Sequence, residues 1–192
     1  MNKAVFIDRD GTLIKNVPYN ANPALIEFLP DAIETLSVLK KNKFLLILIS
    51  NQSGVARGFF SVEQLEEMHD VIQQTLSNFN VKLNAIYYCP HHPEGKIKEY
   101  AIECKCRKPK PGLILKAATK YNIDLNNSWM VGDILNDVEA GNAAGCKTIL
   151  LDNGNETEWI VNEKREPAFT VESWRMIAQT IVSNEKVILK DG

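Results

Sequence analysis

Short apolar runs alternate with segments of helical periodicity along almost the whole chain, and this alternation constrains the fold more than any other feature. The expected strands cover residues 4–7, 44–50, 85–89, 128–133 and 147–152. Apolar side chains at helical spacing predict helices from residue 31, then over 62–79, 111–121, about 136–144 and 173–182. The sequence therefore predicts an α/β protein with a Rossmann-like, mainly parallel sheet and helices on both faces.

Three of these helices carry a recognisable start signal. Asp31 is a plausible N-cap with Glu34 three residues further on, and Ser61 with Gln64 forms a capping box. Pro111 suits the first turn of its helix, where a missing N–H costs nothing.

Composition excludes several classes of protein. The 192 residues carry a formal net charge of −2, and no basic stripe suggests a nucleic-acid footprint. No apolar run approaches the roughly 18 residues of a membrane span, and the chain enters its first strand without a secretory segment. We therefore expect a single domain over residues 1–192, a monomer of the cytoplasm that binds neither nucleic acid nor membrane.

Polar residues stand where several of the expected strands end. Asp8 ends the first strand, Ser50 and Asn51 end the second, and Asp133 ends the fourth. Ligands of open parallel sheets bind at the carboxyl ends of the strands, so these side chains should meet at one edge. The stretch "VFIDRDGTLI" also places Asp10 two residues after Asp8, and like charges so close repel each other. The arrangement predicts a compensating cation.

Two carboxylates and a divalent ion suit the hydrolysis of a phosphate monoester. A carboxylate can attack phosphorus and form an aspartyl-phosphate, which divides a very slow reaction into two easier steps. At about 4 Å a carboxylate and a phosphate dianion repel by several kcal/mol at an effective dielectric of about 20, and Mg²⁺ between them relieves this repulsion. We expect Asp8 to attack and Asp8 and Asp133 to hold Mg²⁺. Asp10 would protonate the leaving oxygen and later deprotonate water.

Nearby residues complete this site. Gly11 permits a tight turn after the first strand, and Thr12 can form a hydrogen bond within the loop. Ser50 and Asn51 offer a hydroxyl and an amide to phosphate oxygens, and Lys108 supplies a positive charge. A lone D-x-D pattern is common, so the prediction depends on all of these residues together.

A second cluster lies in "CPHHPEGKIKEYAIECKC". Cys89 and His91 form one pair, and Cys104 and Cys106 form another after twelve intervening residues. Residues two apart in extended chain point the same way, so each pair can bind one ion. Three thiolates and an imidazole describe a structural tetrahedral Zn²⁺ site in a zinc-binding loop. His92 is out of step with Cys89, which favours His91; the alternative is a set of incidental free thiols.

Together these features resemble the haloacid dehalogenase-like superfamily of phosphohydrolases. The resemblance spans about three quarters of the chain and is carried by "DRDGT" at 8–12, "SNQSG" at 50–54, Lys108 in "CRKPKP" and "GDILND" at 132–137. It implies that Asp8 is the nucleophile and Asp10 the general acid/base. It also implies that Mg²⁺ is held by Asp8, Asp133 and the backbone carbonyl of Asp10.

The same resemblance assigns the phosphate group to Ser50, Asn51 and Lys108. Asp137 then orients Lys108 or the metal shell, or it belongs to the charged first turn of a helix.

The zinc-binding loop, about residues 89–106, narrows the resemblance further. "NQSGVARG" and "YYCPHHPEG…CKCRKPKPG" resemble the D-glycero-D-manno-heptose 1,7-bisphosphate phosphatases, with histidinol phosphatases as close relatives. In that family the loop stands in for a large cap domain, and this length leaves no room for a cap. The resemblance implies removal of the 7-phosphate, with histidinol phosphate or another small sugar phosphate as the alternative substrate.

By the same resemblance, four residues become candidates for binding the sugar and its second phosphate: Gln52, Arg57, Arg107 and Lys110. Guanidinium groups bind phosphate through two hydrogen bonds, which makes Arg107 the strongest of them, whereas Lys110 is alternatively a solvated surface residue. Zinc would hold Arg107 and Lys108 over the cleft. Residues 15–28 and Ile134 depart from the family pattern, and both departures concern specificity.

Three other classes of protein compete with this interpretation. A nucleotide-sugar transferase also uses D-x-D with a divalent ion, but in this chain the motif ends the very first strand. A phospho-receiver would keep its aspartyl-phosphate without turnover. A zinc-based nucleic-acid module would need a basic, aromatic-rich surface, and the sequence has no signal for one.

Overall fold

The computed structural model describes residues 1–188. Helices and strands alternate in the order β1 (Ala4–Ile7), η1 (Pro23–Leu25), α1 (Ala32–Lys41), β2 (Leu45–Asn51), α2 (Ser53–Arg57), α3 (Val62–Asn78), β3 (Ala85–Cys89), α4 (Gly112–Tyr121), β4 (Trp129–Gly132), α5 (Leu135–Ala144), β5 (Lys147–Leu151), β6 (Phe169–Val171) and α6 (Trp174–Ile188).

The strands form one six-stranded sheet in the order β3-β2-β1-β4-β5-β6. Every neighbouring pair in this sheet is parallel, and β1 lies at the centre, where Ile7 is in register with Leu48 of β2 and Val131 of β4. The predicted mainly parallel sheet is therefore confirmed. Because the strands are parallel, all their carboxyl ends open on the same edge.

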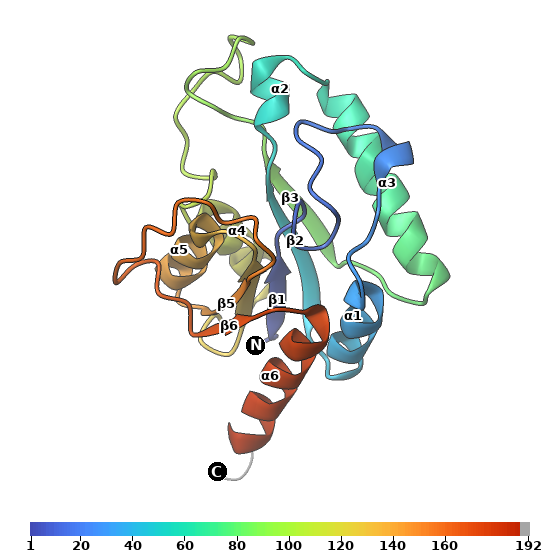
Figure 1. Ribbon diagram of the computed structural model, residues 1–192, viewed down its shortest axis with the longest axis vertical. Helices are drawn as coiled ribbons and strands as arrows, with labels where there is room; N and C mark the ends of the chain where they lie inside the picture. Colours follow the sequence, from blue (N-terminus) through green and yellow to red (C-terminus); the bar gives the residue numbers. More distant parts are fainter. Residues whose placement is uncertain (189–192) are drawn as a thin grey trace.

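Helices cover both faces of the sheet, as the sequence predicts (Figure 1). On one face, α1, α3 and α6 pack through residues such as Leu36, Met68 and Ile177. On the other, α4 and α5 pack through Ile114 and Ala140. β1 and most of β2 are buried on both faces, which explains why these strands read as continuous apolar runs.

Three elements, η1, α2 and β6, escaped prediction, and two helix starts differ in detail from the prediction. β6 has only three residues, two of them exposed, and α2 has only five, so neither is long enough to repeat a hydrophobic pattern. Asp31 precedes α1 but has a φ of 61°, in the left-handed region, and its side chain makes no cap hydrogen bond. Its carboxylate instead accepts from Arg175 Nη2 at 3.0 Å. The capping box of Ser61 and Gln64 is confirmed, and Pro111 lies one residue before α4 rather than in its first turn.

Three long loops leave the carboxyl edge of the sheet and surround this edge (Figure 1). They follow β1 (residues 8–31, containing η1), β3 (residues 90–111) and β5 (residues 152–168). Over residues 1–188 no further sheet or large cap accompanies them. In the same range, no helix combines the length and apolar character needed to cross a bilayer.

Candidate active site and cysteine cluster

A buried lysine lies between two carboxylates at the end of β1. Asp8 follows β1 directly, and its backbone N–H donates to Val131 O at 2.9 Å. Lys108 Nζ forms ion pairs with Asp8 and with Asp137, the latter at 2.6 Å, and donates to Ile49 O at 3.1 Å. Asp137 is fully buried in the first turn of α5, so the same carboxylate belongs to the charged first turn of a helix and pairs with Lys108.

The third buried carboxylate belongs to Asp133, immediately after β4. Thr12 Oγ1 donates to its Oδ1 at 3.0 Å, and Asn155 Nδ2 donates to its Oδ2 at 2.8 Å. Gly11 has a φ of 82°, and a Cβ at this position would lie 2.0 Å from Asp133 Oδ2. Only glycine therefore permits the predicted tight turn beside this carboxylate.

Burial dominates the electrostatics of this centre. It raises the pKa of Asp8 well above its usual value; Lys108 opposes the shift, and the carboxylates of Asp137, Asp133 and Asp10 add to it. The Lys108 pKa is raised as well, because the two carboxylates outweigh the lowering effect of burial.

Burial and the neighbouring Asp137 charge raise the pKa of Asp133 to about 6, against hydrogen bonds from Asn155 and Thr12 that lower it. Asp8, Asp133 and Asp137 each offer a ligand atom within 4.8 Å of the others. Three carboxylates thus face one lysine, and such an excess of buried negative charge fits a divalent cation with oxygen ligands.

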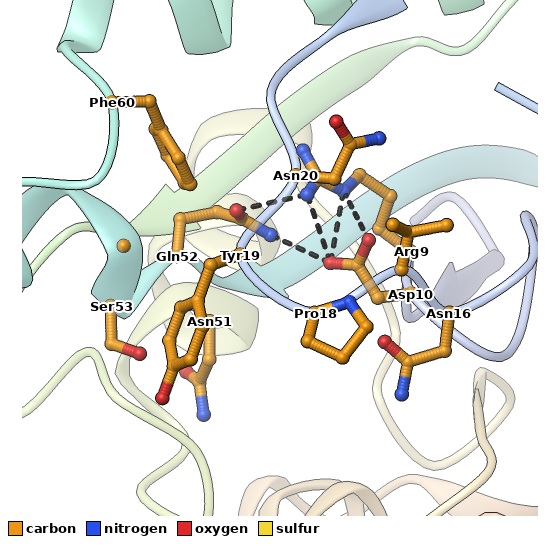
Figure 2. A pocket seen from close by; sticks show the side chains of 12 residues that line it. Arg9, Asp10, Asn16, Pro18, Tyr19, Asn20, Asn51, Gln52, Ser53 and Phe60 are labelled. Carbon is orange, nitrogen blue, oxygen red and sulfur yellow. Dashed lines mark hydrogen bonds and ion pairs between the residues drawn. The ribbon is translucent and has the colours of Figure 1, made fainter. Parts of the chain in front are cut away.

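Asp10 points to a different group of side chains (Figure 2). Arg9 Nε donates to Asp10 Oδ1 and Oδ2 at 3.1 and 3.0 Å, and Gln52 Nε2 donates to Oδ2 at 2.8 Å. Gln52 also binds Arg9 Nη2 and Ser50 Oγ, while His69 Nε2 lies 3.2 Å from Arg9 Nη1. Arg9, His69 and Gln52 are all buried.

A pocket of about 290 Å³ opens beside Asp10. Its walls combine the Tyr19 and Phe60 side chains with amides such as Asn16 and Asn51 (Figure 2). Asn51 is fixed by hydrogen bonds in both directions with the backbone of Lys108, each 3.0 Å long. Amides together with aromatic rings suit a ligand with hydroxyl groups and C–H faces.

The predicted zinc residues converge in the loop after β3. Cys89, His91, Cys104 and Cys106 each offer a ligand atom within 4.8 Å of the others. The three Sγ atoms lie 3.1 to 3.5 Å apart, and His91 Nδ1 lies 3.4 Å from Cys106 Sγ. Although burial raises the pKa of Cys104, hydrogen bonds from Cys106 and Cys89 lower it to about 6. This donor set fits one tetrahedral ion.

Of the four cationic residues predicted to bind phosphate, only Lys108 contacts the buried aspartates at the end of β1. Arg57 Nη2 lies 3.2 Å from His92 Nε2 and 3.8 Å from Glu94 Oε2. Arg107 Nη1 donates to His91 O at 3.5 Å, and Lys110 Nζ donates to Cys104 O at 3.0 Å. Burial, followed by the positive charges of Arg107 and Arg57, lowers the pKa of His92.

Four residues of the site were not identified from the sequence. They are Arg9, His69, Asn153, whose Nδ2 donates to Gly11 O at 2.6 Å, and Asn155. A signal existed for each: Arg9 stands between the two aspartates of "DRDGT", and His69 falls on the apolar face of a predicted helix. The asparagines follow an expected strand, as Asn51 does.

Comparison with known proteins gives the same fold and the same family. Residues 105–176 match a family model described as HAD-hydrolase-like. The D-glycero-β-D-manno-heptose-1,7-bisphosphate 7-phosphatase of Pasteurella multocida is 46% identical over 155 residues, which cover 80% of this chain and 84% of that protein. The protein of the same name from Escherichia coli K12 is 39% identical over 168 residues, covering 83% and 88%.

A solved structure agrees with these relatives. The D,D-heptose 1,7-bisphosphate phosphatase of B. bronchiseptica, complexed with magnesium and phosphate, has a TM-score of 0.77 and 28% sequence identity, covering 96% of this chain and 99% of that chain. The family resemblance predicted from the sequence is thereby confirmed. The chain belongs to the haloacid dehalogenase-like hydrolases and, among these phosphoric monoester hydrolases, to the family of the D-glycero-β-D-manno-heptose-1,7-bisphosphate 7-phosphatases.

Proposed function

We propose that this protein removes the 7-phosphate from D-glycero-β-D-manno-heptose 1,7-bisphosphate through an aspartyl-phosphate intermediate on Asp8. Relatives with this name support the substrate, and each is matched over more than four fifths of its length. The observation that carries the chemistry is the convergence of Asp8, Asp133 and Asp137 on Lys108 at the carboxyl edge of the sheet.

Magnesium fits the excess of negative charge at this edge. Asp8, Asp133 and the backbone carbonyl of Asp10 would hold the ion. The B. bronchiseptica enzyme was solved in complex with magnesium and phosphate, which supports the choice of metal. When bound, Mg²⁺ offsets the repulsion between the attacking carboxylate and the phosphate.

The side chains of the protein then divide the reaction between them. An oxygen of Asp8 attacks phosphorus, the bond from phosphorus to the sugar oxygen breaks, and Asp10 gives that oxygen a proton. In the second step water attacks phosphorus and gives a proton to Asp10, and the bond to Asp8 breaks to release phosphate. Lys108, with Ser50 and Asn51, would hold the phosphate oxygens.

Arg57 of α2 and Arg107 of the loop after β3 would bind the second phosphate. Arg57 contacts the His92 ring and Arg107 donates to His91 O, so both reach the same short segment, and guanidinium groups can bind an anion through paired hydrogen bonds. Gln52 lines the pocket beside Asp10, where it could contact the sugar. Sugar contacts of Gln52 and Lys110 stay predictions.

A structural Zn²⁺ would be held by Cys89, His91, Cys104 and Cys106. Three sulfur atoms and an imidazole complete a tetrahedron and leave no open position for substrate. The ion would fix the loop that carries Arg107 and Lys108.

Phosphate release tests the proposed function directly. Heptose 1,7-bisphosphate, fructose 1,6-bisphosphate and histidinol phosphate are compared with and without Mg²⁺, and the heptose bisphosphate should be hydrolysed fastest and only with the metal. Asp8→Asn should lower turnover by about 10⁴-fold or more, because an amide oxygen is a far weaker nucleophile than a carboxylate.

Asp70→Asn, a change of an exposed carboxylate on α3, should leave the rate unchanged. A clear preference for histidinol phosphate would replace the proposed substrate. Full activity of Asp8→Asn would exclude the aspartyl-phosphate mechanism.

A further inference from the structure

The buried guanidinium of Arg9 forms an ion pair with the carboxylate of Asp10. Arg9 is 1% exposed, and the Asp10 side chain is 26% exposed toward the pocket. Besides the two contacts of Nε, Nη2 lies 3.0 Å from Oδ2, so two nitrogens of the guanidinium reach one carboxylate. Arginine is always charged and its donors are rigidly arranged, so this pairing sets the orientation of the carboxylate.

Gln52 can take only one orientation in this network. Arg9 Nη2 is a donor, so the Gln52 atom 2.9 Å away must be the carbonyl Oε1. The amide nitrogen then faces Asp10 Oδ2 at 2.8 Å and Ser50 Oγ at 2.7 Å. All polar atoms of the side chain are engaged, and the amide ties the phosphate-side hydroxyl of Ser50 to Asp10.

His69 supports the arginine from α3. Its Nε2 lies 3.2 Å from Arg9 Nη1, and because the guanidinium can only donate, the ring nitrogen must be the acceptor of a neutral imidazole. A charged ring at this distance would repel Arg9. His69 therefore also fixes the side of the guanidinium that faces away from Asp10.

The two oxygens of Asp10 consequently differ. Oδ2 accepts hydrogen bonds from Arg9 Nε and Gln52 Nε2 and forms an ion pair with Arg9 Nη2 at 3.0 Å, whereas Oδ1 accepts from Arg9 Nε alone. We infer that Arg9 and Gln52 are positioning residues that saturate Oδ2 and present Oδ1 as the oxygen that exchanges a proton with the leaving group and with water. This inference rests on the proposed role of Asp10 as general acid/base.

Leaving groups of different basicity separate this role from a merely structural one. A sugar oxygen leaves as a strongly basic alkoxide unless it is protonated, and general acid catalysis of such a step is worth about 10²- to 10⁴-fold. A nitrophenolate leaves without a proton. Loss of the Asp10 orientation should therefore slow the first phosphoryl transfer from the sugar far more than from p-nitrophenyl phosphate.

The test measures that first step by rapid quench for Arg9→Met, with heptose 1,7-bisphosphate and with p-nitrophenyl phosphate. We expect a loss of about 10²-fold with the sugar. With p-nitrophenyl phosphate we expect a nearly unchanged first step, seen as a burst of about one equivalent of nitrophenol followed by slow turnover. Arg9→Lys should recover part of the sugar rate, because an ammonium can donate to Oδ2 but cannot span both oxygens.

Arg175→Met is the matched control, because it removes an arginine that pairs with a carboxylate at 3.0 Å on the surface, and both first-step rates should stay at the wild-type value. Gln52→Leu removes one donor to Oδ2 while Arg9 remains, and it should show the same substrate bias with a smaller loss. If Arg9→Met does not fold, Gln52→Leu tests the inference by the same comparison of the two substrates.

Equal losses with both substrates, or no loss with either, would overturn the inference. Asp8→Asn measured alongside tests the proposed function separately, because it should abolish the burst and the turnover with both substrates. Activity of Asp8→Asn would reject the aspartyl-phosphate mechanism. The inference about Arg9 would then be judged separately, from the loss with the sugar relative to the loss with p-nitrophenyl phosphate.

Discussion

At the scale of single residues, two buried cations of the site are each shared between neighbouring side chains. Lys108 is shared by Asp8 and Asp137, and Arg9 is held between Asp10 and His69. Breaking one member of such a set leaves the other charge buried and unpaired, which typically costs several kcal/mol. His69 differs from these groups because it is neutral. Burial, followed by the adjacent charge of Arg9, lowers its pKa to about 3.

The lowered pKa of His69 makes stability depend on pH. Between the unfolded value of about 6.5 and the folded value of about 3, the unfolded chain binds a proton that the folded protein does not, so stability falls as pH falls. His69→Gln keeps an acceptor for Arg9 and removes the titration. Chemical denaturation at pH 7 and pH 5 should show that the variant loses about 2 kcal/mol less than the wild type over this interval.

His92→Gln is the comparison, because the pKa of His92 is also lowered but its ring is only half-buried, and it should reduce the pH dependence of stability less than His69→Gln does. Tyr88, whose ring centroid lies 5.4 Å from that of His69, stays neutral over this interval because burial, followed by Glu66, raises its pKa to about 12. An identical pH dependence in His69→Gln and wild type would mean that His69 is protonated in the folded protein.

At the scale of elements, the loop after β3 has little apolar packing of its own. It docks on α2, where the N–H groups of Lys96 and Ile97 donate to Ala56 O at 2.7 and 2.9 Å. A Cβ on Gly95 would lie 2.8 Å from Ala56 O, so the two backbones approach closely. A metal bound by four residues can contribute on the order of 10 kcal/mol to ordering such a segment.

Replacing one zinc ligand should therefore loosen this loop without changing the magnesium chemistry. In Cys104→Ser we expect a lower zinc content by elemental analysis, a melting temperature lower by several degrees, and residual activity that still requires Mg²⁺. Cys146→Ala is the control, because this thiol is buried apart from the cluster and should leave the zinc content unchanged. Zinc-free wild-type protein would refute the assignment.

At the scale of the whole molecule, the site is assembled from segments that are far apart in the sequence. The segment after β5 connects three of them: Asn153 binds the carbonyl of Gly11, Asn155 binds Asp133, and Glu156 accepts from the first N–H of α5 at 2.7 Å. Residues 153–156 thus hold the β1 loop, the β4 end and the α5 start together.

Removing one of these contacts should weaken metal binding more than it weakens the fold. Asn155 orients a carboxylate that is proposed to hold Mg²⁺, and residues with this role typically change metal affinity by about 10- to 100-fold. Calorimetric titration of Asn155→Ala with Mg²⁺ should show a Kd about 10-fold higher than that of the wild type.

Asn162→Ala is the matched change in the same loop, at an exposed residue whose Oδ1 accepts only from the Lys164 backbone, and it should bind Mg²⁺ as the wild type does. Equal affinities for all three proteins would show that Asp133 needs no support from Asn155. A monomeric state and a cytoplasmic location stay predictions from the sequence.

The sequence by itself determined the order of the main elements and the two sets of chemical groups. Apolar runs, capping residues and strand ends are local features, so the positions of Asp8, Asp133 and the cysteine pairs follow from them. The family motifs do the same for Lys108, although it lies in a loop.

Only the tertiary structure decided which side chains face each other across these elements. Three contacts are examples: Arg9 with Asp10, His69 with Arg9, and Asn155 with Asp133. They connect residues from one to 60 positions apart in sequence. Such contacts depend on side-chain orientation and on how loops pack over the carboxyl edge. Neither is encoded in hydrophobic periodicity, because that pattern records only which face of an element is buried.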